Sequence, residues 1–185
     1  MMNFVYTDRL ILRDWRGGDL EPFAAMNADE KVMEFYPETI SREESDALAM
    51  RLQQDMDAIG FGLYAVEVKS TGNFIGYVGL SEVRFPAAFA PAIEIGWRLA
   101  APAWGRGFAT EAARACLIHG FSQLGFGELV SFTTRGNKKS IAVMDRIGMS
   151  RRPAEDFEHP KLPAGHPLRP HVLYRIGNPG PSAIT

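Results

Sequence analysis

Two glycines, Gly105 and Gly107, lie between a predicted strand that ends near Leu99 and a predicted helix that begins near Ala109. The first N–H groups of a helix have no partner within it, and the helix dipole makes that end positive. Because glycine has no Cβ, a phosphate can approach such a turn closely. We therefore interpret the turn as an anion site suited to a pyrophosphate, with Arg106 adding positive charge at its rim.

Nucleotide-binding loops of other types do not fit this turn. A Walker loop ends in Gly-Lys-Ser or Gly-Lys-Thr, and a dinucleotide fingerprint has three glycines in its own spacing; neither pattern occurs here. Two glycines alone also fit a strand-to-helix turn that binds no ligand. The elements around the turn must therefore support the interpretation.

Two helices are predicted before the turn. Asp19 is placed to cap a short helix over residues 20–28. Ser41 and Glu44 form a capping box, in which each side chain satisfies a backbone N–H of the first turn of a second helix. The second helix carries an apolar stripe at helical spacing, made of Leu48, Leu52, Met56 and Ile59.

The remaining pattern predicts a mixed α/β domain. Strands are predicted over residues 9–15, 63–69, 74–83, 92–99, 128–134 and 171–176, with a further extended segment from Met149 onward. Further helices are predicted over residues 109–124 and 137–147. The strand–helix–strand unit around the glycine turn predicts a right-handed crossover with a parallel strand pair. Residues 1–177 are expected to form a single domain, and residues 178–185 a flexible tail.

Composition limits the classes of function. The chain has 185 residues, a net charge of −2 and a pI of about 6.1, which argues against nucleic-acid binding through a general basic field. Its single cysteine excludes an internal disulfide and favours the cytoplasm. We find no signal-peptide pattern, and no apolar run of the length needed to span a membrane.

Residues 104–112 resemble the coenzyme-binding motif of GNAT acetyltransferases, and most closely that of the ribosomal-protein N-acetyltransferase-like (RimJ/RimL-like) branch. One departure is Trp104, where the wider family usually has Gln or Arg; this puts one polar phosphate contact in doubt. Four further segments match the same branch in the right order. They are residues 7–13, 75–80, 94–97 and 137–149.

The resemblance implies an α/β fold of the GNAT type. Its sheet is mostly antiparallel, with a parallel pair splayed around the coenzyme and helices on both faces. It also implies acetyl transfer from acetyl-CoA to a primary amine by direct attack on the thioester, with no metal. The pantetheine arm would pair with the strand near residues 97–99, where a bulge aims a backbone N–H at the thioester oxygen. The implied coenzyme-binding residues are Trp97, Arg98, Leu99, Trp104, Gly105, Arg106, Gly107, Phe108, Ala109, Thr110, Asn137 and Ser140.

Two residues are candidates for catalysis. Glu94, on the strand beside the expected thioester, is the first candidate for the general base, acting through a water. A structural hydrogen bond across the sheet is the alternative role for Glu94, and Asp156, Glu158 or His159 is the alternative base. Many family members use a Tyr in the late helix as proton donor, but Met144 occupies that position here. Ser140 is the proposed replacement, unless it only supports Asn137, which is expected to cap this helix and to contact the coenzyme.

The acceptor is the least determined part. By the resemblance, Trp15, Phe35, Tyr36 and His159 are expected to line its pocket, with ordinary packing as the alternative. The acceptor would be a small-molecule amine or a protein N-terminus, and the protein a monomer or homodimer. Two other functions remain open: a non-catalytic acetyl-CoA sensor, and a phosphate-binding regulatory domain unrelated to CoA.

Overall fold

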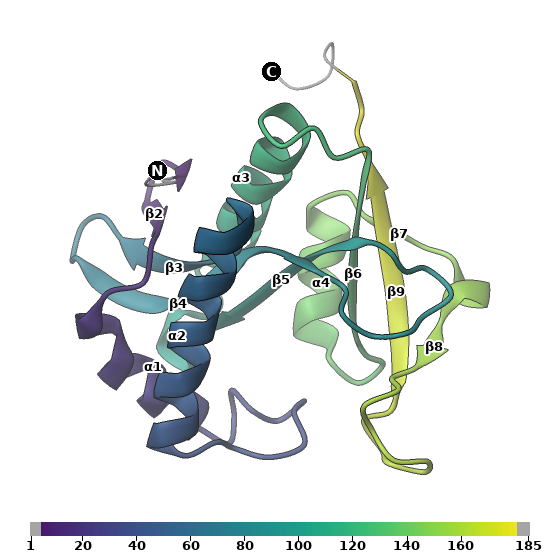
Figure 1. The fold of residues 1–185 in the computed structure, drawn as a ribbon, viewed down its shortest axis with the longest axis horizontal. Coiled ribbons are helices and arrows are strands. Elements are labelled where there is room, and N and C mark those ends of the chain that lie inside the picture. Colours follow the sequence, from purple (N-terminus) through teal and green to yellow (C-terminus); the bar gives the residue numbers. More distant parts are fainter. Residues whose placement is uncertain (1–4, 181–185) are drawn as a thin grey trace.

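The computed structural model describes residues 5–180, which form a nine-stranded mixed sheet with helices on both faces (Figure 1). The strands are β1 (Val5–Tyr6), β2 (Leu10–Arg13), β3 (Leu63–Val68), β4 (Asn73–Glu82), β5 (Ile93–Leu99), β6 (Glu128–Thr134), β7 (Ser150–Arg151), β8 (Phe157–Glu158) and β9 (Pro170–Gly177). The α-helices are α1 (Leu20–Asn27), α2 (Arg42–Ile59), α3 (Phe108–Ser122) and α4 (Lys138–Arg146). Short 3-10 helices lie at Gly17–Asp19, Ala101–Ala103 and Pro153–Glu155.

The sheet divides between β5 and β6. The strand order is β1-β2-β3-β4-β5-β6-β9-β7, and β8 pairs with β9 outside this row. β4 and β5 pair antiparallel along the whole of β5, whereas β5 and β6 share a single parallel pair, Glu94 with Val130. The two strands therefore diverge beyond Glu94. Within the described chain, the edge of β5 that faces β6 has no ladder partner over residues 95–99.

Alternating side chains of β3 and β4 supply the two faces of the sheet. On one face, buried residues of the sheet pack against α3 and α4; they include Tyr64, Val66, Val78, Leu80 and Ile95 from the sheet and Ala113, Cys116, Leu117 and Met144 from the helices. On the opposite face, Tyr77 packs with α1 and α2 through Phe23, Met26, Ala49 and Leu52. The mixed sheet, its splayed parallel pair and its helices on both faces confirm the predicted fold.

Loops, instead of a helix, cover the face of β6 and β9 that lies opposite α4. The segment between β4 and β5 crosses in front of these strands, and the segment that contains β8 lies beside them (Figure 1). Six rings pack there, with centroids 4.7 Å apart for Phe85 and His159 and 5.0 Å apart for Phe89 and Phe157. We call these six residues the aromatic cluster: Phe85, Phe89, Phe132, Phe157, His159 and His171.

The local signals around α2 are confirmed, with two corrections nearby. The Ser41–Glu44 capping box is present, and Gly60 ends the helix with a φ of 81°. Ile59, predicted on the buried stripe, is 38% exposed because it lies in the last turn beyond the sheet contact. Asp19 precedes α1 but does not cap it with its side chain, since its carboxylate accepts hydrogen bonds from Arg13 and from the Arg16 backbone.

The predicted elements agree with the structure to within one or two residues at most ends. β7 confirms the extended segment that was expected from Met149 onward, but it has only two residues. The strands that the sequence did not predict are β1 and β8, which also have two residues each. After β9, Asn178 still donates a backbone hydrogen bond of 2.8 Å to Gly127. Residues 181–185 of the predicted tail lie outside the described residues. No helix among residues 5–180 combines the length and the apolar character needed to cross a membrane.

Candidate active site

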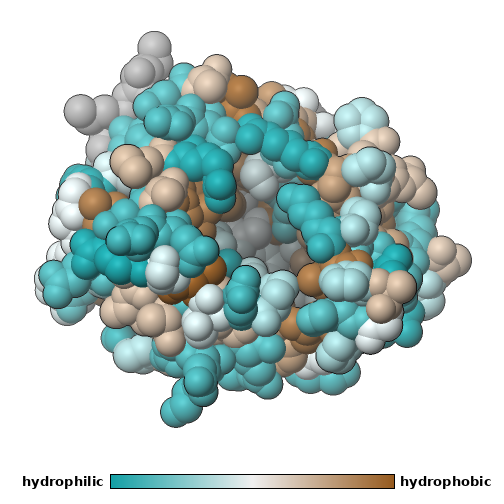
Figure 2. Space-filling view, turned by 60° about the horizontal axis from the view of Figure 1, so that its bottom comes forward, coloured by the Kyte–Doolittle hydropathy of each residue, from teal (hydrophilic) through white to brown (hydrophobic). Residues whose placement is uncertain are grey.

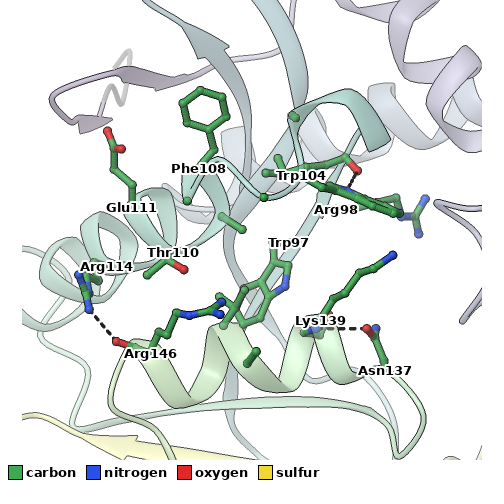
Figure 3. Close-up of a pocket in the computed structure, with 18 of the residues that line it drawn as sticks. Trp97, Arg98, Trp104, Phe108, Thr110, Glu111, Arg114, Asn137, Lys139 and Arg146 are labelled. Carbon is green, nitrogen blue, oxygen red and sulfur yellow. Dashed lines mark hydrogen bonds between the residues drawn. The ribbon is translucent and has the colours of Figure 1, made fainter.

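A groove of about 1240 Å³ lies where β5 and β6 diverge. The last residues of β5, the glycine turn with α3 as far as Ile118, helix α4, and residues 6–9 and 31–36 form its walls. The molecular surface is hollowed, with a largely hydrophilic rim, in the view of Figure 2. The turn and the two helices face one another across the groove in Figure 3. Its position at the gap between two strands of the sheet, lined by elements remote in sequence, is typical of a ligand site.

The glycine turn has the conformation that glycine allows and other residues avoid. Gly105 and Gly107 have φ values of 73° and 79°, and Gly107 is the residue that precedes the first turn of α3. A Cβ at Gly105 would meet no atom within 4 Å. The glycines are therefore required by the left-handed backbone, and the space in front of the turn is open. The unpaired N–H groups at the start of α3 can receive an anion there.

Arg9, near the start of the described chain, contacts this turn and the first turn of α3. Its guanidinium contacts the Glu111 carboxylate at 2.7 Å through Nε and donates to the Arg106 carbonyl at 3.0 Å. Glu111 also accepts hydrogen bonds from the Thr7 hydroxyl and the Arg9 backbone. Burial raises the pKa of Glu111, but these hydrogen bonds outweigh it and hold the pKa below its usual range. The negative charge in the first turn of α3 is thus neutralised by Arg9.

Sequence reasoning did not single out Arg9 as a site residue. Its only signal was that it belongs to a matched segment, residues 7–13. The contact to Glu111 spans 102 residues, so no local pattern could reveal it.

Positive side chains flank the groove. Arg114 and Arg146 lie together, joined by a 2.7 Å hydrogen bond from the Arg114 guanidinium to the Arg146 carbonyl (Figure 3). Lys139 places its Nζ 3.9 Å from the centroid of the Trp104 ring. Arg106, predicted to contact the coenzyme, does not line the groove; its guanidinium lies 4.7 Å from the ring of Phe108.

The other predicted coenzyme residues line the groove: Trp97, Arg98, Leu99, Trp104, Gly105, Gly107, Phe108, Ala109, Thr110, Asn137 and Ser140. Trp104 is fixed by a 2.8 Å hydrogen bond from its indole N–H to the Leu99 carbonyl. The bulge expected in β5 near residues 97–99 is absent from its ladder with β4, whose register is continuous. The register shift lies instead between β3 and β4, beside Val66 and Glu67. The free N–H groups of β5 result from the divergence of β6.

The start of α4 presents Asn137 and Ser140 to the groove. Asn137 caps the helix, since its Oδ1 accepts the Ser140 backbone N–H at 3.1 Å, and its Nδ2 donates to Thr133 at 3.0 Å. The Ser140 hydroxyl makes no hydrogen bond to another described residue, so it is available to a ligand. Met144 is 1% exposed and belongs to the core, and its thioether has no proton to donate.

Glu94 lies on the face of β5 opposite α3, not in the groove wall. Its partner Val130 is two residues from Phe132, so the aromatic cluster lies on the same face as the Glu94 carboxyl. Burial raises the pKa of Glu94 to about 8, and the charge of Lys161 lowers it by less. A carboxyl of this kind takes up and releases a proton near neutral pH.

The alternative bases are less suited to accept a proton. Asp156 has its pKa lowered mainly by the hydrogen bond from Arg151, and Arg135 lies 3.4 Å away. Burial, with the charges of His171 and Lys161, lowers the pKa of His159 to about 4. Glu158 is exposed and pairs with Arg169 at 3.4 Å.

The predicted acceptor residues separate in the structure. Phe35 and Tyr36 line the groove. Trp15 instead packs on Phe23, with ring centroids 4.8 Å apart, and donates to the Leu63 carbonyl at 2.8 Å. His159 belongs to the aromatic cluster on the Glu94 face. Residues 5–180 contain no group of three or more His, Cys, Asp or Glu that could hold a metal ion.

Comparisons with known proteins agree on one family. A family model described as an acetyltransferase (GNAT) domain matches residues 9–150. The uncharacterized protein YkkB of Bacillus subtilis is 34% identical over 144 residues, which cover 77% of this chain and 83% of that protein. The uncharacterized N-acetyltransferase YnaD of the same organism is 26% identical over 172 residues, 93% of this chain and 95% of its own. A GNAT-family acetyltransferase structure from Bacillus anthracis superposes with a TM-score of 0.79 at 22% identity, covering 95% of this chain and 99% of that one.

Proposed function

Because this chain belongs to the GNAT acetyltransferase family, we propose that it transfers an acetyl group from acetyl-CoA to a primary amine, and that the groove between β5 and β6 binds the coenzyme. One observation carries the proposal: the open, left-handed glycine turn at the start of α3 faces the unpaired edge of β5 within a single groove. An anion site and a strand edge are the two features that a pyrophosphate and a pantetheine arm require.

The chemistry of the groove fits the coenzyme. The N–H groups at the start of α3 would hold the pyrophosphate, with no Cβ in front of Gly105 to obstruct it. Arg114, Lys138, Lys139 and Arg146 would compensate the negative charge of the phosphates. The backbone of β5 over residues 95–99 would pair with the amides of the pantetheine arm, as an added strand does at a sheet edge.

Bound acetyl-CoA supplies an acetyl group activated as a thioester, and the protein supplies position and proton transfer. The free N–H groups of β5 are placed to polarise the thioester carbonyl, an effect typically worth about 10²–10³ in rate for one donor. Holding the amine in line with the carbonyl can remove about 7–11 kcal/mol of the barrier in favourable cases.

Glu94 is our candidate for the base that makes the amine nucleophilic. An ammonium has no lone pair, so one proton must leave before the C–N bond forms. The pKa of about 8 lets Glu94 accept this proton, through a water, and return it to solvent. When the C–S bond breaks, the departing thiolate needs stabilisation, and the Ser140 hydroxyl at the start of α4 is placed to donate to it.

We also propose the branch of the family and the class of acceptor. The five segments of the sequence support the RimJ/RimL-like branch, and the acceptor is a small-molecule amine or a protein N-terminus. No feature of the described residues favours the non-catalytic sensor over an enzyme.

Two measurements test the proposed function. CoA at about 100 times its Kd should stabilise the protein by about 2.7 kcal/mol, seen as a higher Tm. Acetyl-CoA with a panel of amines should then release free thiol. An unchanged Tm would refute the coenzyme site, and coenzyme binding without thiol release for any amine would leave the sensor as the better account.

A further inference from the structure

Two arginines of the sheet, Arg13 on β2 and Arg98 on β5, differ in whether a carboxylate accompanies their charge. Arg13, whose side chain is 3% exposed, is neutralised by Asp19 at 2.7 Å and by Glu67 at 2.7 Å. Arg98 has no carboxylate within 4 Å among residues 5–180, and its Nε is buried without a hydrogen-bond partner. Buried charges are costly unless an opposite charge accompanies them. Arg98 is therefore a cation whose partner is not supplied by the described chain.

Neutral groups hold the Arg98 guanidinium. Its Nη1 donates to the Asn27 Oδ1 at 2.7 Å, and its Cζ lies 3.9 Å from the Tyr36 ring centroid and 5.5 Å from that of Tyr77. Burial raises the pKa of Tyr77 against the opposing effect of the Arg98 charge, so the phenol stays protonated and does not neutralise Arg98. These contacts orient the guanidinium and leave its charge uncompensated.

Arg98 lies where an acceptor has room. It lines both the groove and a second cavity of about 420 Å³. Glu38 and Glu44 also line this cavity, but neither forms an ion pair with Arg98, and Glu44 is bonded to the Ser41 backbone at 2.7 Å. In Figure 3 the Arg98 side chain points away from Arg114 and Arg146, which lie at the opposite end of the groove. Its charge is thus separate from the phosphate-binding side.

Arg98 also shares a face of β5 with Glu94. Residues 94, 96 and 98 are every second residue of β5, so they lie on the same face. At the usual strand rise, the Cα atoms of Glu94 and Arg98 are about 13 Å apart. Gly96 leaves the space between them open, since a Cβ there would meet only the Glu94 Oε1, at 3.6 Å. Tyr77 lies on the same face of the sheet, directly opposite Arg98 in the ladder between β4 and β5, and the Arg98 Cζ is 5.5 Å from its ring centroid.

We infer that Arg98 binds a carboxylate of the acetyl acceptor, so that the preferred acceptor is an amine that also carries a carboxylate, such as an amino acid or short peptide. The inference rests on the proposed function, in which Glu94 takes the proton of the acceptor amine. The planar guanidinium suits a carboxylate because two of its N–H groups can donate in parallel. Glu94 would then serve the amine of the acceptor, and Arg98 would bind its carboxylate.

The test compares amino acids with their carboxamides, which keep the amine and lose the negative charge. A charge-assisted hydrogen bond is worth about 1.5–3 kcal/mol, so kcat/KM should be about 10–100 times higher for the acid. Arg98→Met should remove this preference through a higher KM for the acid, and Arg98→Lys should restore part of it. Arg152→Met is the matched control, because Arg152 is exposed, lines neither the groove nor the second cavity, and should not affect the preference.

Binding is measured separately from turnover. The Tm of the CoA-saturated protein should rise with an amino acid and not with its carboxamide, and Arg98→Met should abolish the difference while the Kd of CoA stays unchanged. Equal kcat/KM for acids and carboxamides in the wild type would overturn the inference while leaving acetyl transfer intact. So would an Arg98→Met variant that weakens CoA binding and keeps the preference, since Arg98 would then serve the coenzyme.

Discussion

The Arg9 Nη2 and the Glu111 Oε2 lie 2.6 Å apart and join the start of β2 to the first turn of α3. This ion pair closes the glycine turn from outside, because Arg9 also donates to the Arg106 carbonyl. The position of the turn therefore depends on a segment about 100 residues earlier in the chain.

Glu111→Gln should weaken coenzyme binding and lower stability slightly. The Arg9 side chain is 49% exposed, so the loss of unfolding free energy should be only about 1 kcal/mol, whereas the Kd of CoA should rise several-fold as the turn loosens. Chemical denaturation and calorimetric titration measure the two quantities. Asp46→Asn, which removes an exposed ion pair on α2, is the control and should leave the Kd unchanged. An unaltered Kd in Glu111→Gln would show that the pair does not position the turn.

Gly107→Ala should destabilise the protein by about 1–2 kcal/mol, because an L side chain at a φ of 79° is strained. The Kd of CoA should rise as well, since relief of the strain moves the N–H groups at the start of α3. Gly127→Ala is the matched control: Gly127 has no positive φ and no atom within 4 Å of an added Cβ. Equal Tm and Kd values for the two variants would contradict this account of the turn.

Glu94 should impose a pH dependence on catalysis. As a base with a pKa of about 8, it is active when ionised, so kcat/KM should rise with pH and level off above about 8. Glu94→Gln should lower kcat about 10²–10⁴-fold and remove this limb of the profile. Glu82→Gln, at the exposed end of β4, is the control. A Glu94→Gln variant that keeps the wild-type pH profile would show that another group is the base.

Glu94 should also lower stability as the pH rises. Its pKa is about 8 in the folded protein and 4.5 as an ordinary glutamate, so the folded state binds more protons between these values. The stabilising contribution is complete below pH 4.5 and is lost as the pH rises through about 8. The free energy of unfolding of Glu94→Gln should therefore fall less than that of the wild type between pH 5 and 8, as measured by urea denaturation. Parallel curves for the two proteins would contradict the raised pKa.

Local signals in the sequence were sufficient for the elements that position the site. The Ser41–Glu44 box, the helix cap at Asn137 and the glycine turn each depend on residues within a few positions of one another, and each is present. The divergence of β5 and β6 followed from the family resemblance, not from local patterns.

Contacts between distant segments were not predictable in the same way. The Arg9–Glu111 pair and the Arg98–Asn27 hydrogen bond join residues 102 and 71 positions apart. Trp15 shows the same limit: the family resemblance placed it at the acceptor pocket, but the fold packs it, partly buried, against Phe23 of α1. Residue type indicates what a side chain can do, whereas the tertiary fold decides what it faces.

All nine strands belong to one sheet, but the two halves of the sheet on either side of the gap between β5 and β6 are weakly connected. A single ladder pair, Glu94 with Val130, connects the strands on either side of the gap, so few backbone hydrogen bonds resist a relative movement of the two halves. A molecule bound between β5 and β6 would contact both halves of the sheet, and it would restrict their relative movement as the missing strand pairs would otherwise do. Amide hydrogens of β5 and β6 should therefore exchange with solvent more slowly when the gap is filled.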